Sequence, residues 1–273
     1  MKIVFFRKIV FYLLKKISSR NKLILEVNDL IYEQSIDLEL VVDDFFSFLQ
    51  DKLYTIENCN YIFASNEMKH YVSEKYSILP KYSTVIVNGA PELCDYSFMF
   101  NNEEWMNTDK LKFVYAGSLN KGRQIEDLLA VFDNDKDNLL IVLGNEGEWL
   151  EEIELANNIF YLGNFEEKIA HYLVSKCDIG IIPYNEDRFY YNLCFPTKVS
   201  FYLTAGLPIF STPLKELQNV FYNDDVILFN SFSDWKNVIM NIDKKYIEKM
   251  KKSTDLIKNK YQWDFLLKRF DFK

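Results

Sequence analysis

Glycine and proline are scarce in this chain of 273 residues, which has eight glycines and six prolines. No long stretch therefore has the composition of a disordered linker or a low-complexity tract. Cysteine and histidine are also rare: the four cysteines show no C-x-x-C spacing, and the two histidines lie far from any cysteine pair. These absences argue against a zinc site and a disulfide framework, and they favour a cytoplasmic location.

An excess of positive charge is also lacking, because the net charge is -8 and the isoelectric point is about 5.0. This balance excludes a general nucleic-acid binder, which needs clustered cations. The longest uncharged run near the N-terminus, residues 9–14, is too short for a signal sequence or a membrane span. The basic residues are, however, unevenly distributed along the chain. A group of them precedes the first acidic residue, Glu26: Lys2, Arg7, Lys8, Lys15, Lys16, Arg20 and Lys22.

The first part of the chain, residues 1–104, is predicted to form one lobe. Apolar residues at helical spacing predict a helix over residues 3–17, and a short apolar run predicts a strand that ends at Asn28-Asp29. Further helices are predicted at residues 43–57 and 65–76, the second with Ser65 as N-cap, and further strands at 61–64 and 84–87.

The second part, from residue 111, alternates apolar runs with segments of helical period. Six strands are predicted, at residues 111–117, 138–144, 159–163, 178–184, 207–212 and 225–230. Such a pattern is typical of a parallel sheet covered on both faces, with ligands at the carboxyl ends of its strands. The polar segment 101–110 is the predicted interlobe linker, and two closing helices are predicted at 244–258 and 260–270.

The helix predicted to begin at Pro196-Thr197-Lys198 is the strongest candidate for a phosphate site. Its N-terminus lies at the carboxyl edge of the sheet, where free N–H groups and the positive dipole end attract anions. Lys198 is unfavourable in a first turn unless an anion offsets it, which indicates a ligand. The alternative is that Lys198 simply faces solvent.

A second cationic segment, Gly117 to Arg123, follows the first strand of this lobe. Its glycines allow close backbone approach to a phosphate, and Lys121 and Arg123 supply charge. It lacks the dinucleotide and P-loop fingerprints. Alone it is also compatible with an ordinary solvated connection.

Several segments resemble the glycosyltransferase family 4-like, GT-B-fold transferases of bacterial surface-polysaccharide assembly. They are YAGSLNKGRQIEDLL, IVLGNEGEWLEE, IFYLGNF, CDIGIIPY, FPTKVSFYLTAGLPIFST and YQWDFLLKRF, with EVNDL, NYIFASNEMKHY and VIVNGA in the amino half. The resemblance implies an α/β fold of two Rossmann-like lobes, the second a doubly wound parallel sheet of about six strands. Residues 1–104 would form the acceptor-side lobe and residues 105–258 the nucleotide-sugar lobe. Residues 259–273 would be a helix packing back toward the first lobe.

The resemblance also implies a nucleotide-diphosphate sugar as co-substrate, no other cofactor and no metal. Transfer would proceed with retention onto a polysaccharide or lipid-linked oligosaccharide, as in capsule or exopolysaccharide synthesis. Cations would stabilise the departing diphosphate, and Asn164 and Phe165 would line the base pocket. The expected catalytic residues are Asn28, Asp29, Lys121 and Lys198, and the expected donor-binding residues are Gly117, Ser118, Arg123, Asn164, Phe165, Tyr184, Pro196 and Thr197.

The chain departs from the family pattern at several positions. Ser118 replaces a frequent arginine, Phe201 replaces a helix carboxylate, and Asn28 replaces a histidine that could act as acid or base. The usual first strand, glycine loop and helix are missing, so the first lobe is expected to be truncated. This favours an alternative function: a non-catalytic or truncated donor-binding chain that needs a partner subunit to complete the lobe.

Three further features have two interpretations each. The basic segment 1–20 could contact an anionic membrane surface at its inner face, or be an ordinary helix whose apolar stripe is core. Asp29 could face the sugar or serve as a cap. Asp133-Asn134-Asp135 resembles a metal motif, but its loop position favours a solvated turn. A nicotinamide enzyme is disfavoured because no glycine fingerprint follows any strand.

Overall fold

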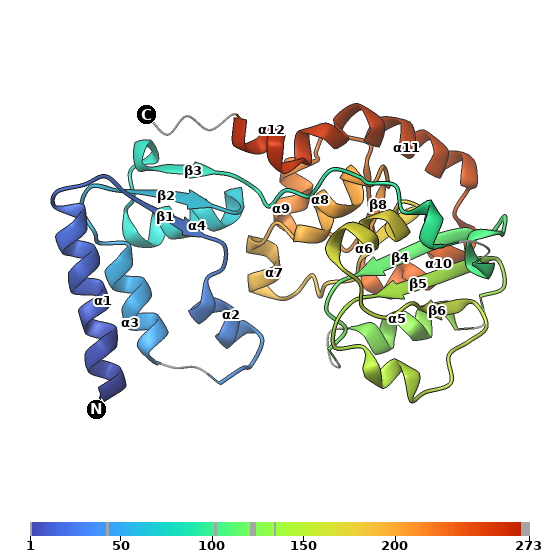
Figure 1. Ribbon diagram of the computed structural model, residues 1–273, viewed down its shortest axis with the longest axis horizontal. Coiled ribbons are helices and arrows are strands. Elements are labelled where there is room, and N and C mark those ends of the chain that lie inside the picture. The colour runs from blue at the N-terminus through green and yellow to red at the C-terminus, as the bar shows by residue number, and fades with distance from the viewer. Residues whose placement is uncertain (1, 42–43, 101–102, 121–123, 134, 269–273) are drawn as a thin grey trace. The chain divides into compact units, whose positions relative to one another are not determined.

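The computed structural model describes residues 2–41, 44–100, 103–120, 124–133 and 135–268 (Figure 1). The chain divides into two compact units. Unit 1 contains the chain up to residue 87 together with residues 187–195, and unit 2 contains residues 88–186 and 196 onward. This division falls earlier than residue 104, where the sequence placed the boundary, and Trp105 of the predicted linker is buried.

Unit 1 is built on a parallel sheet of three strands, in the order β1-β2-β3. Each strand is short, and Leu25 pairs with Tyr61, which pairs in turn with Ser83. The predicted helices and strands are present, and α2 is an additional helix that no capping side chain announces. The elements are α1 (Lys2–Ser18), β1 (Leu23–Val27), α2 (Ile31–Asp37), α3 (Asp44–Leu53), β2 (Cys59–Phe63), α4 (Asn66–Tyr76) and β3 (Ser83–Val85).

Local sequence signals in unit 1 act as predicted at α4 and only partly at α1. The Ser65 hydroxyl accepts a hydrogen bond from the Met68 N–H at 3.1 Å, which makes it the N-cap of α4. In α1, Phe11 and Leu14 pack against the core of unit 1. Tyr12 and Leu13 of the same helix are exposed. The apolar residues of α1 are therefore not all core residues.

The segment before the predicted phosphate helix forms a short helix, α7 (Phe189–Leu193), that belongs to unit 1. Tyr190 and Leu193 are buried in the unit 1 core. The Tyr190 N–H donates to Asp37 Oδ2 at 2.8 Å, and the Ser65 hydroxyl donates to the Leu193 carbonyl. This segment is thus partly helical and is anchored within unit 1.

Unit 2 contains the predicted sheet of six parallel strands, in the order β6-β5-β4-β7-β8-β9. Strand order reverses between β4 and β7, which is the switch point where ligands bind in open α/β sheets. The strands are β4 (Leu111–Ala116), β5 (Asn138–Leu143), β6 (Ile159–Tyr161), β7 (Ile179–Ile182), β8 (Ile209–Ser211) and β9 (Ile227–Phe229).

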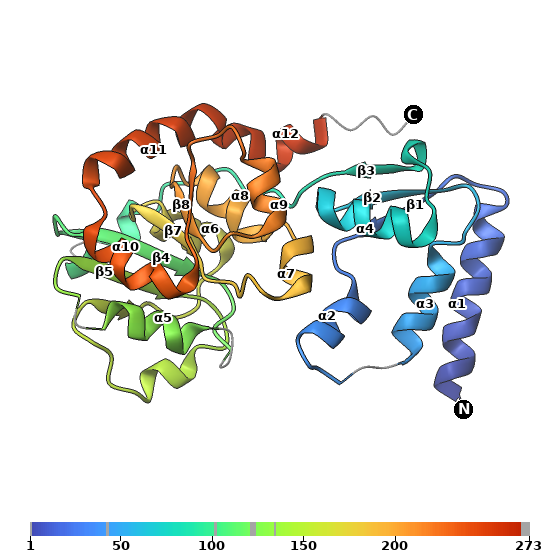
Figure 2. The ribbon, with the colours of Figure 1, turned by 180° about the vertical axis from the view of Figure 1, so that it is seen from behind.

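Helices cover both faces of this sheet (Figures 1 and 2). On one face, α5 and α10 contribute Leu128 and Trp235 to a core with Phe113 and Phe210. On the other face, α8 contacts β7 and β8, and α6 contacts β4. The helices are α5 (Ile125–Phe132), α6 (Glu167–Val174), α8 (Thr197–Thr204), α9 (Lys215–Val220), α10 (Trp235–Asn241), α11 (Lys244–Ile257) and α12 (Trp263–Lys268).

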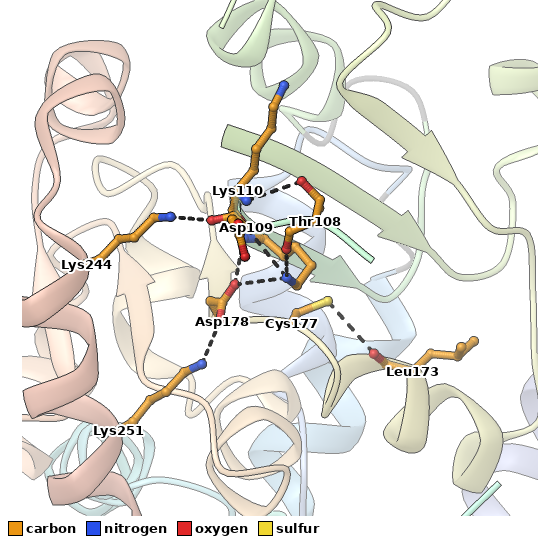
Figure 3. A network of polar contacts seen from close by, with 9 residues as sticks. Thr108, Asp109, Lys110, Leu173, Cys177, Asp178, Lys244 and Lys251 are labelled. Atoms are coloured by element: carbon orange, nitrogen blue, oxygen red, sulfur yellow. Dashed lines mark hydrogen bonds and ion pairs between the residues drawn. The ribbon is translucent and has the colours of Figure 1, made fainter. Parts of the chain in front are cut away.

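A charged network fixes the amino end of β7 to β4 and α11 (Figure 3). The Asp178 carboxylate accepts from the Lys112 N–H at 2.9 Å, and its other oxygen lies 2.6 Å from Lys251 Nζ on α11. Lys244, at the start of α11, donates to the carbonyl of Asp109. These contacts hold α11 at the end of the sheet opposite to the carboxyl ends of the strands.

Among the described residues, no helix is both long and apolar enough to cross a membrane. The packing of the closing helix against the first lobe stays a prediction.

Candidate functional site

A cavity of about 450 Å³ lies at the carboxyl ends of β4, β5, β6 and β7, within unit 2. Its volume falls in the range of small-molecule sites, and its place at the switch point is the one expected for a ligand. It is lined by Gly89, Ala116, Gly117, Ser118, Leu143, Gly144, Asn145, Asn164, Phe165, Glu167, Ala170, Tyr184, Thr197, Lys198 and Phe201.

A larger hollow of about 730 Å³ lies by the amino ends of β5 and β6 and contains Asp133 and Asp135. We favour the smaller cavity because ligands of open α/β sheets bind at the carboxyl ends. Asp135 closes a turn, as predicted, by accepting from the Asn138 N–H at 3.1 Å, but it is buried and not solvated. Within the described ranges, no group of three His, Cys, Asp or Glu side chains could hold a metal ion.

The Lys198 side chain lies against Gly117, so the two segments predicted to bind phosphate meet in this cavity. A Cβ atom on Gly117 would lie 2.5 Å from Lys198 Nζ and 2.6 Å from its Cε. Gly117 has a φ of +150°, and the turn continues through the Leu119 N–H, which donates to the Asn145 carbonyl at 2.9 Å. Glycine is therefore favoured at this position by its backbone conformation, and it also leaves the space in which the lysine end lies.

The ammonium of Lys198 is held among phenol groups. Its Nζ donates to Tyr184 Oη at 3.1 Å and lies 4.9 Å from the centre of the Tyr115 ring. Burial acts to lower the pKa of Lys198, but the neighbouring Tyr115, Tyr184 and Tyr202 outweigh it, so the pKa is raised above its ordinary value. Lys198 therefore remains a cation at neutral pH and faces the cavity with a full positive charge.

Helix α8, which carries Lys198, is fixed to the sheet by Tyr202 one turn later. Tyr202 Oη accepts from the Ala116 N–H at 2.9 Å and donates to the Ile181 carbonyl at 3.3 Å, so it bridges β4 and β7. A Cβ atom on Gly180 would lie 2.2 Å from the Tyr202 ring. Gly180 is thus the residue that lets α8 approach the sheet closely.

Pro196 and Gly206 define the two ends of α8. Pro196 is the N-cap residue, and no side chain caps the first turn. Gly206, with a φ of +83°, ends the helix: the Leu207 N–H donates to the Tyr202 carbonyl and the Gly206 N–H to the Leu203 carbonyl. This double hydrogen bond is a Schellman motif. The helix that presents Lys198 is therefore short and defined at both ends.

The turns after β4 and β5 pack so closely that glycine is required at Gly144. Its φ is +148°, and a Cβ atom there would lie 1.8 Å from the Gly117 carbonyl oxygen. Nearby, the Ser118 hydroxyl donates to Glu146 Oε2 at 2.6 Å. The floor of the cavity is therefore made of closely packed backbone, which suits contact with a charged ligand group.

The other part of the cavity is formed by α6, the turn before it and the second turn of α8. Phe165 lies in the turn before α6, Glu167 is the first residue of α6, and Phe201 comes from α8. The His171 ring joins these helices, because its Nε2 lies 3.1 Å from the Phe201 carbonyl and 3.0 Å from Thr204 Oγ1. Burial lowers the pKa of His171 to about 4, so this ring is neutral at pH 7.

Seven of the predicted site residues line this one cavity: Gly117, Ser118, Asn164, Phe165, Tyr184, Thr197 and Lys198. Pro196 is buried beside it as the cap of α8. Lys121 and Arg123 lie outside the described residues. The chemical roles of all these residues stay predictions. Sequence reasoning missed Gly89 and Glu167. The available signal for Glu167 was its position two residues after Phe165, the end of the predicted base-pocket segment.

Asn28 and Asp29 lie in unit 1, directly after β1, and both are exposed. The Tyr190 hydroxyl donates to Asp29 Oδ1 at 2.5 Å, so Asp29 anchors α7. Burial first, and then Cys194 and the bond to Asp29, raise the pKa of Tyr190, which therefore remains a protonated donor. Leu30, and not Asp29, is the N-cap residue of α2, so the structural partner of Asp29 is Tyr190 of α7 and not the end of the next helix.

The two Rossmann-like units, with a lysine and a glycine turn at the carboxyl ends of the larger sheet, define a glycosyltransferase of the GT-B fold. A family profile described as glucosyltransferase 3-like, C-terminal domain, matches residues 113–270, which is more than half of the chain. The chain therefore belongs to this glucosyltransferase 3-like family. A search of curated protein sequences gave no significant match.

Solved structures confirm the predicted fold at low sequence identity. Sucrose-phosphate synthase from Thermosynechococcus elongatus aligns with a TM-score of 0.69 and 13% identity, over 95% of this chain and 69% of that chain. WaaG, a glycosyltransferase involved in lipopolysaccharide biosynthesis, gives 0.62 and 10%, over 91% and 75%. Anabaena HepE in complex with UDP gives 0.64 and 12%, over 92% and 71%.

Proposed function

We propose that this chain transfers a hexosyl unit from a nucleotide-diphosphate sugar to a polysaccharide or lipid-linked oligosaccharide. The observation that carries the proposal is the meeting of Lys198 and Gly117 in one cavity at the switch point of the unit 2 sheet. A permanent cation beside a glycine turn and a helix N-terminus is suited to a diphosphate. The UDP bound in HepE supports this choice of ligand class.

In the proposed reaction, the bond between the sugar C1 and the diphosphate oxygen breaks, and its electron pair stays with the nucleoside diphosphate. The acceptor hydroxyl oxygen bonds to C1, and its proton passes to a phosphate oxygen of the leaving group. Negative charge grows on the diphosphate as the bond breaks, and Lys198 would stabilise it. Lys121, Arg123 and Thr197 are proposed to assist.

Retention and independence from metals are part of the proposal. Lys198 supplies the positive charge that a divalent ion would otherwise provide to the diphosphate. Product formation in EDTA, with the anomeric configuration of the product read by NMR, tests both statements. Loss of turnover in EDTA with recovery on Mg²⁺ or Mn²⁺ would contradict the first, and an inverted product the second.

The acceptor side is proposed to lie on unit 1, with Asn28 and Asp29 near the sugar or acceptor. Contact with an anionic membrane surface is proposed for residues 1–20, because exposed Tyr12 and Leu13 lie on α1 with Lys15 and Lys16. The involvement of WaaG in lipopolysaccharide biosynthesis supports an acceptor of this kind. Sedimentation with anionic liposomes at low and high salt tests the membrane contact; absence of binding at both would contradict it.

The donor proposal is tested with purified protein and a panel of UDP, GDP and ADP sugars. Thermal shift and calorimetry measure binding, and release of free sugar measures donor hydrolysis. Lys198→Met keeps the apolar stem but removes the charge, and we expect binding of the preferred nucleotide to fall about 100-fold. Lys168→Met is the matched control, because Lys168 is exposed on α6 and does not line the cavity. Unchanged binding in Lys198→Met would contradict the diphosphate site.

The alternative is a donor-binding chain that acts only with a partner subunit. It is favoured by the small sheet of unit 1, in which β1 pairs with β2 alone among the described strands. The edge of a sheet is a place where another chain can add a strand. Nucleotide binding without turnover on any acceptor, with turnover restored by a co-expressed partner, would establish this alternative.

A further inference from the structure

Unit 1 has a cavity of its own, of about 560 Å³, at the amino edge of its sheet. Three lining residues come directly before the three strands: Lys22 before β1, Asn58 before β2 and Tyr82 before β3. The strands are parallel and begin at one edge, so these positions meet although they are far apart in the sequence. Asn28 and Asp29 follow β1 at its other end. The full lining is Ser18, Ser19, Arg20, Asn21, Lys22, Asn58, Asn60, Lys81 and Tyr82.

The lining of this cavity includes three basic side chains and no carboxylate. Arg20 follows α1, Lys22 precedes β1, and Lys81 lies in a 3-10 turn (Pro80–Tyr82) before β3. Among the described residues, no carboxylate forms an ion pair with Arg20 or Lys81. The cluster runs against the composition of the chain, whose net charge is -8. Cations around one cavity repel one another, and a bound anion would relieve that repulsion.

The carboxyl end of α1 borders the cavity, and its last carbonyl groups would by themselves repel an anion. Side chains of the lining cover these groups. The carbonyls of residues 15–17 accept hydrogen bonds from Ser18 Oγ, Ser19 Oγ and Asn21 Nδ2, at 2.9, 2.8 and 3.1 Å. The acceptors nearest to the cavity are thus engaged within the protein, and the basic groups determine which ligand charge is favoured.

We propose that this cavity binds a phosphate group carried by a larger molecule, either a soluble phosphorylated compound or the head group of a phospholipid. The three basic side chains supply the charge, and the planar fork of Arg20 can donate to two phosphate oxygens at once. The Tyr82 hydroxyl and the side-chain amides of Asn58 and Asn60 add neutral donors. The volume of about 560 Å³ is that of a small-molecule site and exceeds the volume of a phosphate ion.

This site goes beyond the proposed transfer reaction, because it shares no residue with the cavity of unit 2. A structural role would explain part of the cluster, since Arg20 and Lys22 follow the carboxyl end of α1, where cations offset the helix dipole. It does not explain Lys81, which belongs to a separate segment. The two roles also differ in their consequence: a structural role predicts no change in phosphate binding when the charges are removed.

The experiment measures pyrophosphate binding by calorimetry in a parent protein that carries Lys198→Met, which suppresses binding in the cavity of unit 2. The double substitution Arg20→Gln and Lys81→Gln removes two cations from the cavity of unit 1, and we expect pyrophosphate to bind about tenfold more weakly or worse. The matched control is the double substitution Lys15→Gln and Lys16→Gln. It removes the same charge from exposed side chains in the last turn of α1 that do not line the cavity. We expect the control to change binding less than about twofold.

Vesicle sedimentation distinguishes the two sources of the phosphate group. The vesicles contain phosphatidylcholine with phosphatidylglycerol, or phosphatidylcholine alone. If the ligand is a head group, the Arg20 and Lys81 substitutions reduce sedimentation with the anionic vesicles more than the control does, and pyrophosphate releases the bound parent protein. If the ligand is a soluble compound, the two double variants sediment alike while pyrophosphate binding still separates them. Either result supports the site.

Three results would overturn the inference. Equal losses of pyrophosphate binding in the two double variants would reduce the cluster to a general charge effect. Unchanged binding after the Arg20 and Lys81 substitutions would leave only the structural role, and no pyrophosphate binding to the parent protein would remove the site. Nucleotide binding to the protein with an intact Lys198 is measured separately, so a failure of this site is distinct from a failure of the proposed function.

Discussion

The Lys198 side chain occupies the space that any side chain at position 117 would need, since a Cβ atom on Gly117 would lie 2.5 Å from Lys198 Nζ. The end of the lysine side chain is flexible and can move aside, so relief of the clash costs little free energy. The ammonium would, however, leave its place between the turn and the Tyr184 hydroxyl. A small change at Gly117 should therefore affect ligand binding more than folding.

Gly117→Ala is expected to lower the free energy of unfolding by about 1–2 kcal/mol, because alanine is strained at a positive φ. Displacement of Lys198 should in addition weaken nucleotide-diphosphate binding about tenfold or more. Gly163→Ala is the control: Gly163 also has a positive φ, of +88°, but its Cβ would meet no atom within 4 Å. We expect a similar loss of stability in urea unfolding and no loss of binding. Equal binding losses in both variants would contradict a specific role for the Gly117–Lys198 contact.

The buried ring of His171 predicts a pH dependence of stability. Its pKa of about 4 in the folded state lies below the ordinary value of 6.5, so the unfolded chain binds the proton more readily. The stabilising effect of a neutral His171 is complete above pH 6.5 and is lost as the pH falls toward 4. Between pH 7 and pH 5, protonation linked to this residue alone should lower the free energy of unfolding by about 2 kcal/mol.

The measurement compares urea unfolding of the wild type and His171→Gln at pH 7 and pH 5. The difference in the free energy of unfolding between the wild type and the variant should be smaller at pH 5 than at pH 7 by about 2 kcal/mol. Other titrating groups contribute equally to both proteins and cancel in the comparison. His70→Gln is the control, because His70 is exposed on α4. If the free energies of unfolding of the wild type and His171→Gln differed by the same amount at both pH values, the proposed titration would be ruled out.

Much of unit 2 was predictable because its signals are local. Continuous apolar runs predict buried parallel strands, and the carboxyl ends of such strands meet at one edge, so Gly117 and Lys198 could be brought together by reasoning alone. The place of α7 was not predictable in this way. It depends on the hydrogen bond between Tyr190 and Asp29, which are 161 positions apart in the sequence. Glu167 was missed because an acid in a first helical turn is also a common structural feature.

The bond between Asp29 and Tyr190 gives a test of two roles for Asp29. If Asp29 anchors α7, Asp29→Asn and Tyr190→Phe should each reduce stability by about 1–2 kcal/mol, and the double variant should lose little more than either one. If Asp29 instead takes part in transfer, Asp29→Asn should lower kcat at nearly unchanged stability. Urea unfolding of the two single variants and the double variant, together with steady-state kinetics, separates these outcomes.

The last prediction concerns two ion pairs that α11 makes at the same distance. Lys251 Nζ lies 2.6 Å from Asp178, and Lys249 Nζ lies 2.6 Å from Asp225. The Asp178 side chain is 21% exposed and also accepts from the Lys112 N–H, whereas the second pair is 39% and 69% exposed. Asp178→Ala leaves a half-buried lysine and a strand N–H without their acceptor, so we expect a loss of about 2–3 kcal/mol. Asp225→Ala should change the unfolding midpoint little, because exposed pairs are screened by water and salt. Similar losses of unfolding free energy in both variants would contradict this prediction. They would mean that the N–O distance decides how much these pairs stabilise α11, and that burial and the hydrogen bond from the Lys112 N–H do not.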